Sequence, residues 1–209
     1  MSDDILELSV AWQRHVAPTT ELLDRLLARH REKHRRYHTV RHVAWVIRHI
    51  DALAADGCDL VDHGAVVAAA CYHDAVYEPA SPANERASAR LAARDLRTLG
   101  WVDARIERVV QMIEGTKDHH QPADTDTAVL FDADLAILGA DPAAYGDYST
   151  QVRAEYRHVD DIDWATGRAA VLQSLLDRPS IFATEQGRAR WDERARGNLT
   201  AELAELAAR

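Results

Sequence analysis

Hydrophobic side chains recur along most of the chain at the three- and four-residue spacing of amphipathic helices. No stretch alternates apolar and polar residues in the way a convincing strand would. The pattern therefore predicts an all-α protein. Stripes of this kind occupy residues 5–12, 22–27, 43–50, 102–114, 145–156, 172–176 and 191–206, and a further helix is expected from the Ser81-Pro82 start to Gly100.

Two predicted helices have almost no polar face. Residues 64–72 contain no charged side chain, so this helix must be surrounded by protein. The segment 128–139 is nearly as apolar but contains Asp132 and Asp134. Burying an unpaired carboxylate is costly, so each aspartate needs a hydrogen bond, a cation or a metal. Side chains two apart on a helix point about 200° apart, so the two cannot face one site. Asp134 shares the more apolar face, and Asp132 is assigned a supporting or capping position.

The adjacent residues His73 and Asp74 end the apolar helix 64–72. Neighbours on a helix point about 100° apart, which is close enough to converge on one ion. A hydrogen bond between the two inside the core is the alternative. His38 lies at the start of the helix 43–50, which Thr39 can cap. Two imidazoles and two carboxylates on three helices suit one divalent transition metal, namely Mn, Co, Fe, Ni or Zn, and the absence of thiolates favours a catalytic site.

Composition limits the range of functions. The 209 residues are 47% hydrophobic, which suffices for one domain with a substantial core. A net charge of -9 argues against a nucleic-acid or anionic-membrane partner. No apolar run approaches the roughly 20 residues of a membrane span, and the acidic N-terminus lacks signal-peptide features, so we expect a cytoplasmic protein. The basic run 29–36 is either a solvated helix end or a segment that attracts anions.

The order His38 … His73-Asp74 … Asp134 resembles the HD-domain superfamily of metal-dependent phosphohydrolases, within it a branch of predicted enzymes with undefined substrates. The resemblance implies a single domain over 1–209, an HD-type helical bundle with its metal-binding core at about 34–140 and additional C-terminal helices at about 141–209. The matching elements are Tyr37-His38-Thr-Val-Arg41-His42-Val43, Tyr72-His73-Asp74-Ala-Val-Tyr77, Asn84-Glu85-Arg-Ala-Ser88-Ala89, Thr116-Lys-Asp-His119, Asp132-Ala-Asp134-Leu-Ala-Ile-Leu-Gly139, Arg153-Ala-Glu155-Tyr156 and Gly167-Arg168.

The resemblance implies that four residues bind the metal, which are His38, His73, Asp74 and Asp134. The candidates for positioning water or protonating a leaving group are Glu85, Glu78 and His119. The cationic residues that could hold phosphate oxygens, or serve only as ion-pair partners, are Arg41, Lys117, Arg153 and Arg168. Supporting positions are assigned to His42, Asn84 and Asp132. His42 departs from the aliphatic residue common in the superfamily, and a spare ligand or a general acid are its alternative roles.

These residues together predict a hydrolase in which one divalent metal activates water against the phosphate ester of a nucleotide or another small phosphorylated metabolite. Two alternatives remain open. One is a di-iron oxygenase of HD type, with His42, His119 and His120 supplying a second site. The other is a catalytically silent protein that binds a nucleotide or metal. A homodimer is also left open, because Trp101, Trp164 and Trp191 could lie on a dimer face or in the core.

Overall fold

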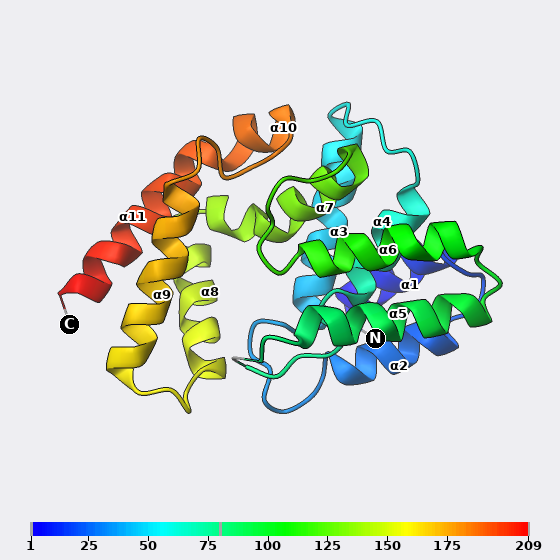
Figure 1. Ribbon diagram of the computed structural model, residues 1–209, viewed down its shortest axis with the longest axis horizontal. Coiled ribbons are helices and arrows are strands. Elements are labelled where there is room, and N and C mark those ends of the chain that lie inside the picture. The colour runs from blue at the N-terminus through cyan, green and yellow to red at the C-terminus, as the bar shows by residue number, and fades with distance from the viewer. Residues whose placement is uncertain (1, 80, 209) are drawn as a thin grey trace.

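The computed structural model describes residues 2–79 and 81–208, and this part of the chain is helical without any strand (Figure 1). The predicted all-α class is therefore confirmed. One prediction needs refinement, because the apolar segment 128–139 is an α-helix only as far as Leu135 and continues as a 3₁₀ turn, η1 (Ala136–Gly139). The first seven helices are α1 (Asp3–His15), α2 (Glu21–Arg29), α3 (Val40–Ala55), α4 (His63–Tyr72), α5 (Asn84–Thr98), α6 (Asp103–Gly115) and α7 (Thr125–Leu135).

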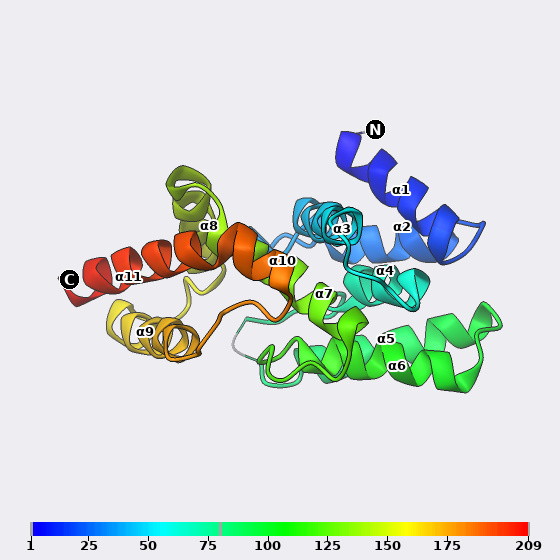
Figure 2. The same ribbon diagram turned by 90° about the horizontal axis from the view of Figure 1, so that it is seen from above.

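Helix α4 lies at the centre of this part of the molecule. It packs against α1, α2, α3, α5, α6 and α7, and every residue from Gly64 to Tyr72 is buried. Figure 2 shows α4 between the layer of α1 to α3 and the pair α5 and α6. A side chain on Gly64 would collide with the backbone carbonyl of His15 and with Arg105, so only glycine permits this approach of α1 and α6 to α4. The lack of a polar face on α4 thus reflects burial on all sides.

The N-terminal end of α4 is fixed by two carboxylates. Asp62 caps the helix by accepting the N–H of Ala65 at 3.0 Å and pairs with Arg105 of α6 at 2.6 Å. Asp126 of α7 has no exposed surface and accepts the N–H groups of Val61 and Asp62 at 2.7 and 3.0 Å. Hydrogen bonds to an ionised carboxylate are stronger than hydrogen bonds between neutral groups. They anchor the helix whose other end carries His73 and Asp74.

The C-terminal helices form the opposite end of the molecule, where α8, α9 and α11 lie together in both views (Figures 1 and 2). Helix α11 packs on α9 and on η1. The guanidinium of Arg168 in α9 holds both carboxylate oxygens of Glu202 in α11 at 2.9 Å, and both side chains are buried. The elements are α8 (Pro142–Glu155), α9 (Asp161–Leu176), α10 (Glu185–Gly187), the π-helical turn η2 (Arg188–Asp192) and α11 (Glu193–Ala207).

Trp164 and Trp191 are buried, so these two indoles belong to the interior of the chain. No helix of the described residues combines the length and the apolar character needed to cross a bilayer.

Candidate metal centre

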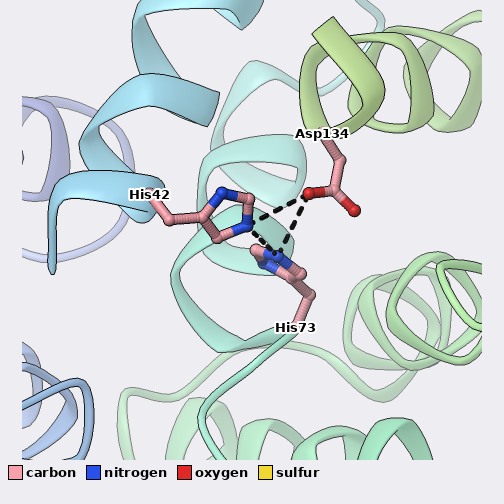
Figure 3. A group of neighbouring side chains, drawn as sticks. All are labelled: His42, His73 and Asp134. Carbon is pink, nitrogen blue, oxygen red and sulfur yellow. Dashed lines mark hydrogen bonds and ion pairs between the residues drawn. The ribbon is translucent and has the colours of Figure 1, made fainter. Parts of the chain in front are cut away.

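Four donor atoms converge where the C-terminal end of α4 meets α3 and α7. The Nε2 atoms of His42 and His73 lie 3.1 Å apart. Asp134 Oδ1 lies 3.1 Å from the first nitrogen and 3.5 Å from the second, as Figure 3 shows. Asp74 Oδ2 lies 3.4 Å from His42 Nε2 and 3.0 Å from His73 Nε2. The arrangement joins two imidazoles and two carboxylates from three segments of the chain.

The spacing of these atoms is that of ligands around one small cation. Ligand atoms bound about 2.1 Å from an ion lie about 3.0 Å apart in an octahedron and about 3.4 Å apart in a tetrahedron. The separations given above, 3.0 to 3.5 Å, span these two values. His42, His73 and Asp134 could therefore hold a metal ion, with the donor atoms all within 4.8 Å of one another. Asp74 Oδ2 lies beside this group, within 3.4 Å of both imidazole nitrogens.

The backbone of α4 sets the tautomer of His73. Its Nδ1 lies 2.8 Å from the carbonyl oxygen of Ala70, which can only accept a hydrogen bond. Nδ1 therefore carries the proton, and the Nε2 lone pair of the neutral ring faces the two carboxylates. Lone pairs at this distance repel unless a proton or a cation lies between them. His42 lacks this support, because its buried Nδ1 has no partner among the described residues.

The charges of the cluster are strongly coupled. Burial alone would raise the pKa of Asp74 and Asp134, yet the neighbouring His73 holds both pKa values well below the usual range. Burial alone would lower the pKa of His73, but Asp74 and Asp134 raise it well above the usual value. The two buried carboxylates therefore stay ionised only with positive charge beside them. Either protonated imidazoles or a divalent ion could supply this charge. Metal binding at such a site would release protons.

The sequence predicts His38 as the first ligand, but among the described residues it is His42 that belongs to the group able to hold an ion, so the geometry favours His42. Helix α3 begins at Val40, which puts His42 in its first turn with its ring directed at His73. His38 precedes the helix, and its Nδ1 instead lies 2.6 Å from Glu155 Oε2. This carboxylate orients the imidazole of His38, and His38 lies outside the group of residues that could hold an ion. His38 still lines the cleft beside the cluster.

Arg35 connects the segments that carry the candidate ligands, although nothing in the sequence distinguishes it from its basic neighbours. Arg35 is 3% exposed, and its guanidinium donates to the carbonyl oxygens of Asp74 and His38 at 2.7 and 3.1 Å. It thereby connects the segment after α4 with the segment before α3. In the sequence it is one of many cations in the basic run 29–36, whose pattern predicts a solvated helix end or an anion-attracting segment. Only the fold singles it out.

A cleft of about 780 Å³ opens from the cluster toward α8 and α9. Five of the other predicted site residues line it, which are Asn84, Glu85, Lys117, His119 and Arg168. His119 Nε2 lies 2.8 Å from Asp134 Oδ2. The φ angle of His119 is +50°, a left-handed conformation that costs roughly 1–2 kcal/mol and is typical of functional sites. Arg178 holds this turn by donating to the carbonyl oxygens of Asp118 and His119.

Three predicted phosphate-binding or catalytic residues lie outside that cleft. Arg41 lines a separate depression with the segment 30–36, because it points away from His42 on the first turn of α3. Arg153 donates to Asp161 and to two backbone carbonyl groups, so its guanidinium holds the connection from α8 to α9. Glu78 contributes backbone groups that bond to Asn84. The structure gives these three residues no contact with the cluster.

The supporting residues Asn84 and Asp132 act on the backbone. Asn84 of α5 bonds to both the N–H and the carbonyl of Glu78, which holds the segment after Asp74. Asp132 points away from the cluster and accepts the N–H groups of Ala183 and Thr184 at 2.7 and 2.8 Å. It thus fixes the start of α10, and Asp132 and Asp134 of α7 face different neighbours, as their spacing predicts.

Comparison of the chain with protein-family models, with curated proteins and with solved structures gave no match.

Proposed function

We propose that this protein is a metal-dependent phosphohydrolase of the HD type. The observation that carries the proposal is the group of His42, His73 and Asp134 donor atoms 3.1 to 3.5 Å apart in an open cleft, with Asp74 Oδ2 within 3.4 Å of both imidazole nitrogens. The order of the donors along the chain, His42 … His73-Asp74 … Asp134, adds support, because it is the ligand order that the sequence resemblance implies with His42 in place of His38.

A divalent ion held by these residues would lower the pKa of a water molecule and offset the charge of phosphoryl oxygens. In the reaction the water oxygen bonds to phosphorus, the ester P–O bond breaks, and the departing alcohol oxygen takes up a proton. Two side chains of the cleft can move protons at this end, His119 beside Asp134 and Glu85 on α5. Lys117 is exposed in the cleft, and its ammonium forms no ion pair with the described residues, so it is free to meet a phosphate oxygen.

The test is turnover by metal-loaded protein of a panel containing phosphomonoesters, phosphodiesters and phosphoanhydrides. We expect hydrolysis of at least one class, abolished in Asp74→Asn and retained in Arg41→Met, whose side chain lies outside the cleft. Circular dichroism verifies that both variants fold. Metal binding without turnover of any class would instead support the silent binding protein. About two irons per chain with an oxygen-dependent spectrum would support the oxygenase.

A further inference from the structure

The cleft is far larger than a phosphate group needs. Its volume of about 780 Å³ lies within the roughly 300–1,000 Å³ of pockets that enclose drug-sized ligands. The donor cluster occupies one end, and the remainder extends along α8 and α9. The C-terminal helices therefore form the wall that would face the part of a substrate farthest from the reacting phosphorus.

That wall is mainly apolar, although Asp163 and Ser174 of α9 also line it. Val171 of α9 is 51% exposed and lines the cleft, so a large aliphatic surface is left facing solvent. The rings of Tyr156 and Trp164 lie 5.3 Å apart at 45° beside the same cleft. Apolar side chains gathered in a concave site are typical of surfaces that bind the apolar part of a ligand. The other apolar residues of this wall are Tyr148, Val152, Val159 and Leu175.

The cleft has little spare positive charge. The guanidinium of Arg168 is paired with Glu202, whereas that of Arg178 donates to backbone carbonyl groups and keeps its charge. Among the described residues of the lining, Lys117 supplies the one ammonium. Apart from the donor cluster, the lining also carries the carboxylates of Glu85, Asp118 and Asp163. A chain of phosphates extending from the donor cluster along this cleft would meet more carboxylates than free cations, and like charges at close range repel.

We infer that the substrate is a phosphomonoester with a single phosphate on an apolar body of aromatic size, which lies against α8 and α9. This inference rests on the proposed function, because the phosphate end is assigned to the donor cluster. Small polar phosphate esters and polyphosphates are therefore not expected to be preferred substrates. Burial of one ring against the wall is expected to raise kcat/KM by at least about tenfold, which corresponds to about 1.4 kcal/mol.

The kinetic experiment compares benzyl phosphate with ethyl phosphate, whose leaving alcohols are similar in acidity, and a nucleoside monophosphate with its triphosphate. We expect metal-loaded protein to prefer benzyl phosphate and the monophosphate by about tenfold or more. Val171→Asn makes the wall polar at an exposed position and is expected to reduce the benzyl preference several-fold. Ile162→Asn is the matched control, because Ile162 is 80% exposed on the same helix but does not line the cleft.

A binding experiment separates this inference from the proposed function. Benzylphosphonate and methylphosphonate, which contain a P–C bond in place of the ester bond, are titrated into metal-loaded protein by calorimetry. Tighter binding of benzylphosphonate, weakened in Val171→Asn, supports the apolar wall even if no ester is hydrolysed, in which case the proposed function fails alone. Equal affinity for the two phosphonates, or equal kcat/KM for the two esters, overturns the inference and leaves a hydrolase with another substrate.

Discussion

Glu155 joins α8 to the segment before α3 through one fully buried carboxylate. Its Oε1 accepts the backbone N–H groups of Arg36, Tyr37 and His38 at 2.6, 2.8 and 3.1 Å. Its Oε2 lies 2.6 Å from His38 Nδ1 and accepts the Tyr77 hydroxyl at 2.8 Å. The substitution Glu155→Gln keeps the size of the side chain and an oxygen for the three N–H groups, but removes the charge.

The effect on stability follows from the pKa of Glu155. Burial alone would raise this pKa, but His38 and the donated hydrogen bonds outweigh burial and lower it from 4.5 to about 2. A difference of this size corresponds to about 3 kcal/mol of folding free energy. Because the folded-state pKa is the lower one, this stabilisation is fully present above pH 4.5 and disappears as the pH falls toward 2. By pH 3 about 2 kcal/mol of it should be lost.

The assay is urea-induced unfolding followed by circular dichroism at several pH values from 7 to 3. Glu155→Gln should be less stable than the wild-type protein by about 3 kcal/mol at neutral pH, and the gap should narrow by about 2 kcal/mol at pH 3. Glu205→Gln, at an exposed position on α11, is the control and should show almost no gap. If the difference in unfolding free energy between the wild-type protein and Glu155→Gln stayed constant over the whole pH range, the lost charge could not be its cause.

Three further variants and one control, Arg41→Met, test the cleft and the C-terminal helices. Lys117→Met should raise KM several-fold with little change in kcat, whereas Arg41→Met should leave both unchanged, as steady-state kinetics will reveal. His119→Asn should lower kcat by roughly 10²-fold while metal content, measured by elemental analysis, is retained. Arg168→Met leaves the Glu202 carboxylate buried without its cation and should lower the free energy of unfolding by about 3–5 kcal/mol in urea titrations; a loss below about 1 kcal/mol would mean that this pair is solvated.

The helices and their buried faces could be predicted from the sequence because they depend on local periodicity. Helix α4 was recognisable as a central helix because residues 64–72 offer no polar face, and all of them are buried. The opposite directions of Asp132 and Asp134 followed from helical geometry alone. The end of α7 was less well predicted, because the 3₁₀ turn that follows continues the same apolar pattern.

The choice between His38 and His42 could not be made from the sequence, because it depends on where α3 begins. Both imidazoles lie near that boundary, and the helix starts between them at Val40. The carboxylate bonded to the imidazole of His38, that of Glu155, is 117 residues distant in the chain. The apolar wall of the cleft likewise depends on how the C-terminal helices pack. Long-range packing of this kind leaves no periodic signal in the sequence.

The central claim is that His42, His73, Asp74 and Asp134 form a centre for one metal ion. The direct test is elemental analysis after equilibration of the protein with Mn²⁺ and removal of free ion, carried out on the wild-type chain and three folded variants. We expect about one ion per chain in the wild type and in His38→Gln, and almost none in His42→Gln or Asp134→Asn. An ion retained in His42→Gln but lost in His38→Gln would contradict the ligand set, and no bound ion in the folded wild type would contradict the metal centre itself.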